Sequence, residues 1–143
     1  MTNLMYVDFV DSESRIFAGE AEFIVVSGYD GEIGIYPNHT ALISKLVPGV
    51  LRIKLPAQEE QLIFAISGGF LEVCNNTVIV LGDIVERTDE LDEQRLLAQK
   101  TDALEKLKRA ESSPTPDVAI AQASLEITIA QLKAFEFIRG RIK

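Results

Sequence analysis

Glycine is confined almost entirely to the first part of this 143-residue chain. Eight of the nine glycines lie at or before Gly82, and the ninth is Gly140. Because glycine serves tight turns and destabilises helix interiors, turns should be dense before about residue 87 and sparse after it. We therefore expect two domains of different structure, residues 1–87 and 88–143.

The first part contains short apolar or alternating runs rich in β-branched and aromatic residues. Eight such runs fit β-strands: 5–10, 22–27, 32–36, 42–47, 50–55, 61–67, 70–74 and 77–81. Asn75 and Asn76 separate the last two runs, and asparagine tolerates the positive φ of a two-residue hairpin turn. Strands of this length with turns between them predict a mostly antiparallel β-sandwich or barrel.

After Arg87 the apolar residues follow helical spacing. Asp89 can cap a helix, and the segment 112–117, SSPTPD, would end it. The apolar stripe of this helix comprises Leu96, Ala103, Leu107 and Ala110, widened by Leu97 and Leu104. A second helix is expected from about 116 to 139, so that the second part forms a helical hairpin.

The second helix is more apolar than a hairpin partner requires. One side carries Val118, Ala121, Leu125, Leu132 and Phe135, and Ile120, Ile127, Ile129, Ala130, Phe137 and Ile138 lie off that side. A helix that is apolar on two sides has two surfaces to bury. Either it contacts both the first helix and the β domain, or one face exchanges partners. Residues 125–129 also alternate in the manner of a strand.

Charge limits the classes of partner. The net charge of −8 repels polyphosphate and anionic lipid, so we expect neither nucleic-acid binding nor membrane insertion. The one basic feature is the C-terminal tip, which carries Lys133, Arg139, Arg141 and Lys143. These residues either complement the helix macrodipole or bind a partner.

Cysteine content and hydropathy indicate the compartment. Cys74 is the single cysteine, which excludes an intramolecular disulfide and fits a reducing environment. No apolar run approaches the roughly 18 residues of a membrane span, and no secretory signal opens the chain. A soluble intracellular protein is expected.

The sequence supplies little catalytic chemistry. His39 is the single histidine, no serine lies in a GxSxG motif, and neither zinc-ligand spacing nor a P-loop is present. The glycines of GYDGEIG, residues 28–34, are wrongly spaced for a dinucleotide site. Three classes stay open at this point: an interaction subunit, a stand-alone β-sandwich module that binds a small ligand, and a small hydrolase that would need His39.

The β segments resemble one known family. Residues 31–42, GEIGIYPNHTAL, are similar to the GELGILPGHAPLL signature of the epsilon subunit of F-type ATP synthases. Further matches follow in the family's order and spacing at 48–49, 67–73, 77–81 and 91–95. The resemblance spans nearly the whole chain. Asn38 departs from the usual glycine, which asparagine tolerates if φ is positive.

The resemblance implies a ten-stranded antiparallel β-sandwich followed by a two-helix hairpin. It implies a non-catalytic rotor subunit of the central stalk, which joins the gamma shaft to the membrane ring of c subunits and drives no chemistry of its own. The location implied is peripheral, on the cytoplasmic face of the bacterial inner membrane. The hairpin would extend toward the alpha and beta subunits and restrain ATP hydrolysis.

Site residues carry over from the resemblance position by position. The c-ring contact would be Tyr29, Asp30, Gly31 and Glu32. The gamma contact would be His39, Thr40, Ala41, Leu42 and Ser44, and the basic tip would meet the catalytic head.

Some bacterial relatives bind ATP at the hairpin through a pattern like [IL]DxxRA plus further arginines. Leu91, Asp92 and Arg95 fit that pattern, but Leu96 replaces its alanine and the second helix has no arginine before Arg139. These departures weigh against a nucleotide site, and no other cofactor or metal is expected.

Overall fold

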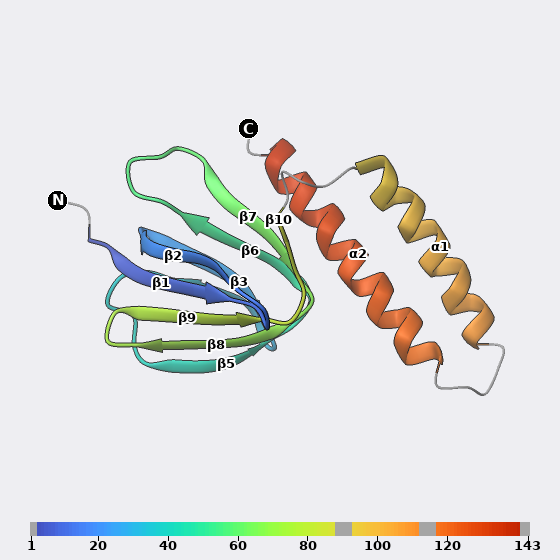
Figure 1. Ribbon diagram of the computed structural model, residues 1–143, viewed down its shortest axis with the longest axis horizontal. Helices are drawn as coiled ribbons and strands as arrows, with labels where there is room; N and C mark the ends of the chain where they lie inside the picture. Colours follow the sequence, from blue (N-terminus) through green and yellow to red (C-terminus); the bar gives the residue numbers. More distant parts are fainter. Residues whose placement is uncertain (1–2, 88–92, 112–116, 141–143) are drawn as a thin grey trace.

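Ten β-strands precede two α-helices in the computed structural model, which describes residues 3–87, 93–111 and 117–140 (Figure 1). The strands are β1 (Met5–Val10), β2 (Arg15–Ala21), β3 (Phe23–Gly28), β4 (Gly31–Ile35), β5 (Leu42–Leu46), β6 (Gly49–Lys54), β7 (Gln61–Ile66), β8 (Gly69–Cys74), β9 (Thr77–Gly82) and β10 (Val85–Arg87). The helices are α1 (Glu93–Glu111) and α2 (Asp117–Gly140). The expected β-then-α fold class is confirmed.

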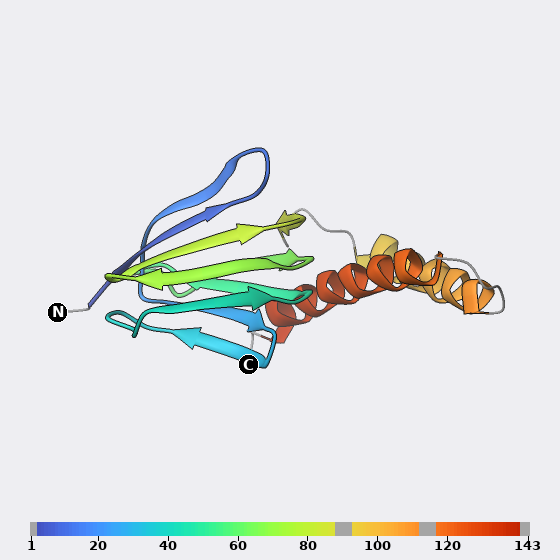
Figure 2. The same ribbon diagram turned by 90° about the horizontal axis from the view of Figure 1, so that it is seen from below.

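The strands form one continuous sheet in the order β10-β7-β6-β3-β5-β8-β9-β1-β2, with β4 paired to β3. Neighbouring strands are antiparallel except β1 and β9, which are parallel. Figures 1 and 2 show the sheet curling over itself. Phe9 of β1 meets Phe64 of β7 edge to face, with ring centroids 5.1 Å apart. Because these strands are not neighbours in the sheet, their contact shows that one face encloses a core.

The inner face of the sandwich is lined by alternate residues of its strands. On β8, Leu71 and Val73 are buried while Phe70, Glu72 and Cys74 are exposed. An antiparallel sheet with one buried face and one solvent-exposed face shows this period of two. The core cluster draws large apolar side chains from eight strands, including Val7, Ile24, Ile35, Leu46, Ile53, Ile66 and Val80.

β6 and β7 depart from that alternation because their outer face is also covered. β7 buries four successive residues, and Ile63 and Ala65 point away from the sandwich core. They face α2, which lies against β6 and β7 (Figure 1). Figure 2 shows the end of α2 nearest the C-terminus against the sandwich and the other end of this helix extending away from it. The second helix thus contacts both α1 and the β-sandwich, as its two apolar sides predict.

The helical stripes are only partly buried. Ala103 is buried and Leu107 half-buried, whereas Leu97 and Leu104 are exposed. On α2 Leu125 is buried, Ala121, Leu132 and Phe135 are half-buried, and residues 125–129 are helical rather than extended. Asp89, Leu96, Ala110, Val118, Phe137 and Ile138 also carried helix predictions, and their side chains lie outside what the structure describes.

Asparagine occupies the predicted left-handed positions. Asn75 and Asn76 have φ of 51° and 59°, so they form the expected turn between β8 and β9. Asn38 has φ of 66°, which explains how it replaces the glycine of the signature.

No helix within the described residues is long and apolar enough to cross a membrane.

Candidate interaction surfaces

The predicted c-ring residues form the tight turn between β3 and β4. Gly28 pairs with Gly31, whose φ of 125° requires glycine. The turn projects Tyr29, which is 71% exposed, and Asp30 beside it. The Tyr29 N–H donates to the Lys45 carbonyl at 3.1 Å and so ties the turn to β5.

Glu32 at the start of β4 is not an isolated solvated carboxylate. Its Oε1 lies 3.6 Å from the Arg52 guanidinium on the outer face of β6. The Glu32 side chain is still 53% exposed, so an ion pair of this kind contributes less than about 1 kcal/mol. The carboxylate remains available to a partner.

The predicted gamma residues lie at the opposite end of β4, in the loop 36–41 and in β5. The His39 N–H donates to the Tyr36 carbonyl at 3.2 Å, and His39 Nδ1 lies 2.6 Å from the Thr40 carbonyl. Thr40 and Ala41 are exposed. Leu42, by contrast, packs against the sandwich core.

Ser44, the last predicted gamma residue, is half-buried, and its hydroxyl donates to the Lys45 carbonyl at 3.1 Å. It pairs with the buried Leu71 of β8, so it shares the inward face of the sheet. The outward position of β5 is therefore the intervening Ile43.

An exposed apolar row crosses the outer face of β5, β8 and β9, and the predicted site did not include it. Ile43 is 77% exposed, Phe70 54% and Leu81 49%. Phe70 stands directly opposite Leu81 in the ladder between β8 and β9, and Ile43 lies diagonally from Phe70 in the ladder between β5 and β8. Strand alternation could have found this row, because residues flanking buried positions face outward. We call Ile43, Phe70 and Leu81 the outer apolar row.

The hairpin is docked on the sandwich by a small second core. Val50, Ile63 and Ala65 of the sheet meet Ala130 and Ala134 of α2, with Ile127 packed beside them. Alanine contributes one methyl group, and burial of a methylene-sized group stabilises by about 0.8 kcal/mol. We call these six residues the docking cluster.

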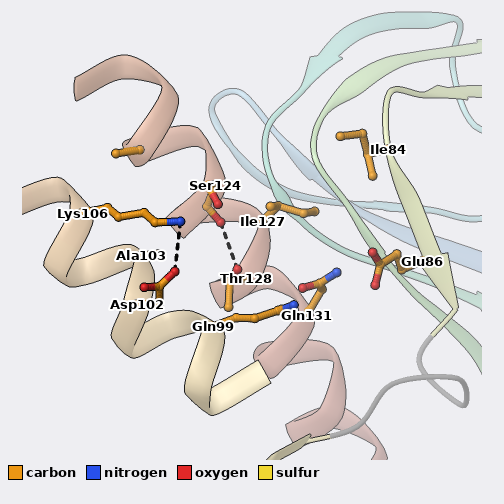
Figure 3. Close-up of a pocket in the computed structure, with 11 residues that line it drawn as sticks. Ile84, Glu86, Gln99, Asp102, Ala103, Lys106, Ser124, Ile127, Thr128 and Gln131 are labelled. Atoms are coloured by element: carbon orange, nitrogen blue, oxygen red, sulfur yellow. Dashed lines mark hydrogen bonds and ion pairs between the residues drawn. The ribbon is translucent and has the colours of Figure 1, made fainter. Parts of the chain in front are cut away.

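A cavity of about 400 Å³ lies between α1, α2 and β10 (Figure 3). Gln131 is 6% exposed, and Figure 3 shows it and Glu86 extending into the space between α2 and β10. Within α1, Lys106 Nζ lies 3.0 Å from Asp102, and within α2 the Thr128 hydroxyl donates to the Ser124 carbonyl at 3.0 Å.

The chemistry of this cavity does not suit a nucleotide. Among the described lining residues the one cation is Lys106, and it already pairs with Asp102. The Glu86 carboxylate adds negative charge, whereas polyphosphate needs several unneutralised cations. Of the predicted nucleotide residues, Arg95 lies exposed on α1, and Leu91 and Asp92 lie outside the described residues.

The predicted basic tip is described only in part. Lys133 is exposed on α2 and Arg139 belongs to the same helix, whereas Arg141 and Lys143 lie outside the described residues. Within the part of the chain that is described, no group of three or more His, Cys, Asp or Glu side chains could hold a metal ion.

Comparison with known proteins defines the class of this fold. The family model for the beta-sandwich domain of the ATP synthase delta/epsilon chain matches residues 4–88. In solved structures, a chain of Euglena gracilis mitochondrial ATP synthase aligns with a TM-score of 0.80 and 22% identity, over 92% of this chain and 81% of that one. A chain of the Tetrahymena thermophila central stalk and c-ring aligns with a TM-score of 0.59 and 15% identity, over 92% and 96%.

Full-length relatives narrow the class. The ATP synthase epsilon chain of Laribacter hongkongensis is 42% identical over 138 residues, 96% of this chain and 97% of the relative. That of a Janthinobacterium species is 44% identical over 141 residues, 99% of both. The chain belongs to the ATP synthase epsilon chain family. It is a subunit of the ATP synthase complex and not the catalytic one.

Proposed function

We propose that this chain is a rotor subunit of a proton-translocating F-type ATP synthase, joining the gamma shaft to the c ring. Its β-sandwich would make both contacts, and its hairpin would restrain ATP hydrolysis by reaching the alpha and beta subunits. It would act at the cytoplasmic face of the bacterial inner membrane as a peripheral subunit. No bound nucleotide is required for this role.

The outer apolar row is the observation that carries the gamma contact. Three large apolar side chains stand exposed on adjacent strands, and the row begins on the strand that follows the predicted gamma loop. Contiguous exposed apolar side chains mark protein contact surfaces.

The two predicted contacts lie at opposite ends of a single strand. The turn with Tyr29 precedes β4 and the loop with His39 follows it. Residues 33–38 lie between Glu32, the last predicted c-ring residue, and His39, the first predicted gamma residue. Two partners can therefore be held at once without competing, as a coupling subunit requires.

The docking cluster supports the hairpin's proposed movement. Shifting a two-state equilibrium from 1:99 to 99:1 takes about 5.5 kcal/mol of differential binding. The docking cluster has six residues, three of them alanines, so a helix-length apolar contact elsewhere can compete with it.

Reconstituted ATP synthase tests both parts of the proposal. Ile43→Arg should lower the affinity for the gamma subunit at least about tenfold, since it places a charge in an apolar contact. Ile120→Arg is the control, because Ile120 is similarly exposed but lies on α2. Unchanged gamma binding in Ile43→Arg would reject the outer apolar row as the contact.

Removal of residues 112–143 should raise ATP hydrolysis while synthesis and assembly stay largely intact. A hairpin that only stabilises the sandwich would instead lower the melting temperature and leave hydrolysis unchanged. That second result would remove the inhibitory role from the proposal.

A further inference from the structure

Asn76 joins three segments that are far apart in the sequence. Its Nδ2 donates to the Leu4 carbonyl at 2.8 Å, and its Oδ1 accepts the Asn38 N–H at 2.8 Å. Its own carbonyl accepts the Tyr6 N–H at 3.1 Å. The turn between β8 and β9 is thereby bonded to the start of β1 and to the loop 36–41.

The orientation of the Asn76 amide follows from its partners. A backbone N–H can only donate, so the atom facing Asn38 must be the oxygen. A backbone carbonyl can only accept, so the atom facing Leu4 must be the nitrogen. The side chain therefore has one orientation in which both bonds form, and a rotated amide would lose both.

The hydrogen bond from the Asn38 N–H to Asn76 Oδ1 is made by the residue of the loop that has a left-handed backbone conformation. Asn38 has φ of 66°, a region that asparagine enters at some cost when nothing holds it there. The next residue is His39, whose N–H donates within the loop to Tyr36. The Asn76 side chain thus supplies an anchor from outside the loop at the residue that sets the loop's path.

We propose that Asn76 is a positioning residue that holds the loop 36–41 in the conformation its partner subunit recognises. The proposal rests on the gamma contact proposed above. Asn76 need not touch gamma, because it acts through the Asn38 amide.

Three variants separate this role from general stability. Asn76→Gly keeps the left-handed backbone and removes both side-chain bonds. Asn76→Asp keeps an oxygen for the Asn38 N–H and loses the donor to Leu4. Asn75→Gly is the matched control: Asn75 has φ of 51°, and its carbonyl, not its side chain, accepts the Thr77 hydroxyl at 3.5 Å.

Hydrogen exchange of the Asn38 amide and affinity for gamma are measured on the full chain below its melting temperature. In Asn76→Gly we expect exchange about tenfold faster and a gamma dissociation constant raised about three- to tenfold, the range for one lost hydrogen bond. Asn76→Asp and Asn75→Gly should match the unsubstituted chain in both the exchange rate of the Asn38 amide and the gamma dissociation constant. The melting temperature should nevertheless fall in Asn76→Asp, because its carboxylate faces the Leu4 carbonyl.

A merely structural role predicts a different order, in which gamma affinity follows melting temperature and Asn76→Asp behaves like Asn76→Gly. That order would overturn the proposal, as would fast exchange at Asn38 with unchanged gamma affinity. Ile43→Arg measured beside them separates the two proposals. If Ile43→Arg weakens gamma binding and Asn76→Gly does not, only the positioning role of Asn76 fails. If neither variant weakens gamma binding, the proposed gamma contact fails as well.

Discussion

The sandwich core and the docking cluster are both apolar and both buried, yet they differ in the size of their side chains. The sandwich core interlocks large residues, with Phe9 and Phe64 in edge-to-face contact. In the docking cluster, α2 contributes the buried Ala130 and Ala134 and the partly buried Ile127, which meet Val50, Ile63 and Ala65 of the sheet. Large side chains lose many contacts when a core opens, whereas alanines lose few. The buried alanines of α2 therefore lose fewer contacts when their interface opens than the large side chains of the sandwich core would.

A substitution in the sandwich core, compared with one at an exposed site on α2, can break this comparison. Phe9→Ala should lower the free energy of unfolding by about 3 to 5 kcal/mol, because Phe9 is 0% exposed and the cavity left behind cannot collapse. Urea denaturation measures it. Ile120→Ala, at a 70% exposed site, should change stability by less than about 0.5 kcal/mol. A loss below about 1 kcal/mol in Phe9→Ala would show that the sandwich is not the rigid member of the pair.

Residues 1–87 should fold without the helices, which makes the proposed domain boundary testable. The fragment keeps the whole sandwich core and exposes the sheet side of the docking cluster, Val50, Ile63 and Ala65. Their exposure should lower the unfolding free energy by about 2 to 4 kcal/mol. A single cooperative thermal transition of the fragment is expected. A broad transition would mean that the sandwich depends on the hairpin for its packing.

Ala134→Leu should loosen the hairpin and spare the sandwich. Ala134 is fully buried against the sheet, and the larger side chain should weaken docking by about 1 to 3 kcal/mol. Hydrogen exchange of the α2 amides should quicken while exchange in β7 stays slow. Ala123→Leu is the control, since Ala123 lies exposed on the same helix. Equal protection of α2 in both variants would contradict the release of this interface.

The smallest expected effect concerns Asp11, in the turn between β1 and β2. The backbone N–H groups of Glu13 and Ser14 donate to its carboxylate and hold its pKa below the ordinary value of 3.8. A carboxyl whose pKa falls on folding stabilises the protein above its unfolded pKa, and this contribution is lost as pH falls through the folded pKa. The stability gap between the unsubstituted chain and Asp11→Ala should therefore be constant near neutral pH and shrink below 3.8. A gap independent of pH would mean that the charge plays no part.

Apolar and alternating runs in the sequence predicted eight strands. They did not predict the strands in which such a run is short or interrupted. Each of the eight expected runs overlaps a strand, but β2 and β10 were not found from the pattern. β2 is an edge strand whose Ala18 and Gly19 break the alternation, and its register with β1 shifts at Phe9 and Val10. β10 has three residues, too few to show a period.

The docking cluster could not be predicted for a related reason. Alanine carries a weak hydrophobic signal: the apolar residues counted on the second helix placed Ala130 beside Ile120 and Ile129 without distinction and did not include Ala134. The structure leaves both isoleucines exposed and buries both alanines. Close approach of α2 to the sheet selects small side chains, and that selection depends on the tertiary arrangement. The tie from Asn76 to Asn38 likewise joins residues that no local pattern connects.

The parallel pairing of β1 with β9 makes the order of synthesis matter. Tyr6 pairs with Thr77, so the first strand waits about 70 residues for its partner. At 5 to 20 residues per second, that wait lasts roughly 4 to 14 s. Until then β1 has only β2 beside it, and one edge of this hairpin can pair with another nascent chain. A chain interrupted before β9 would keep that edge open permanently, so incomplete copies should aggregate rather than compete for a place in the enzyme.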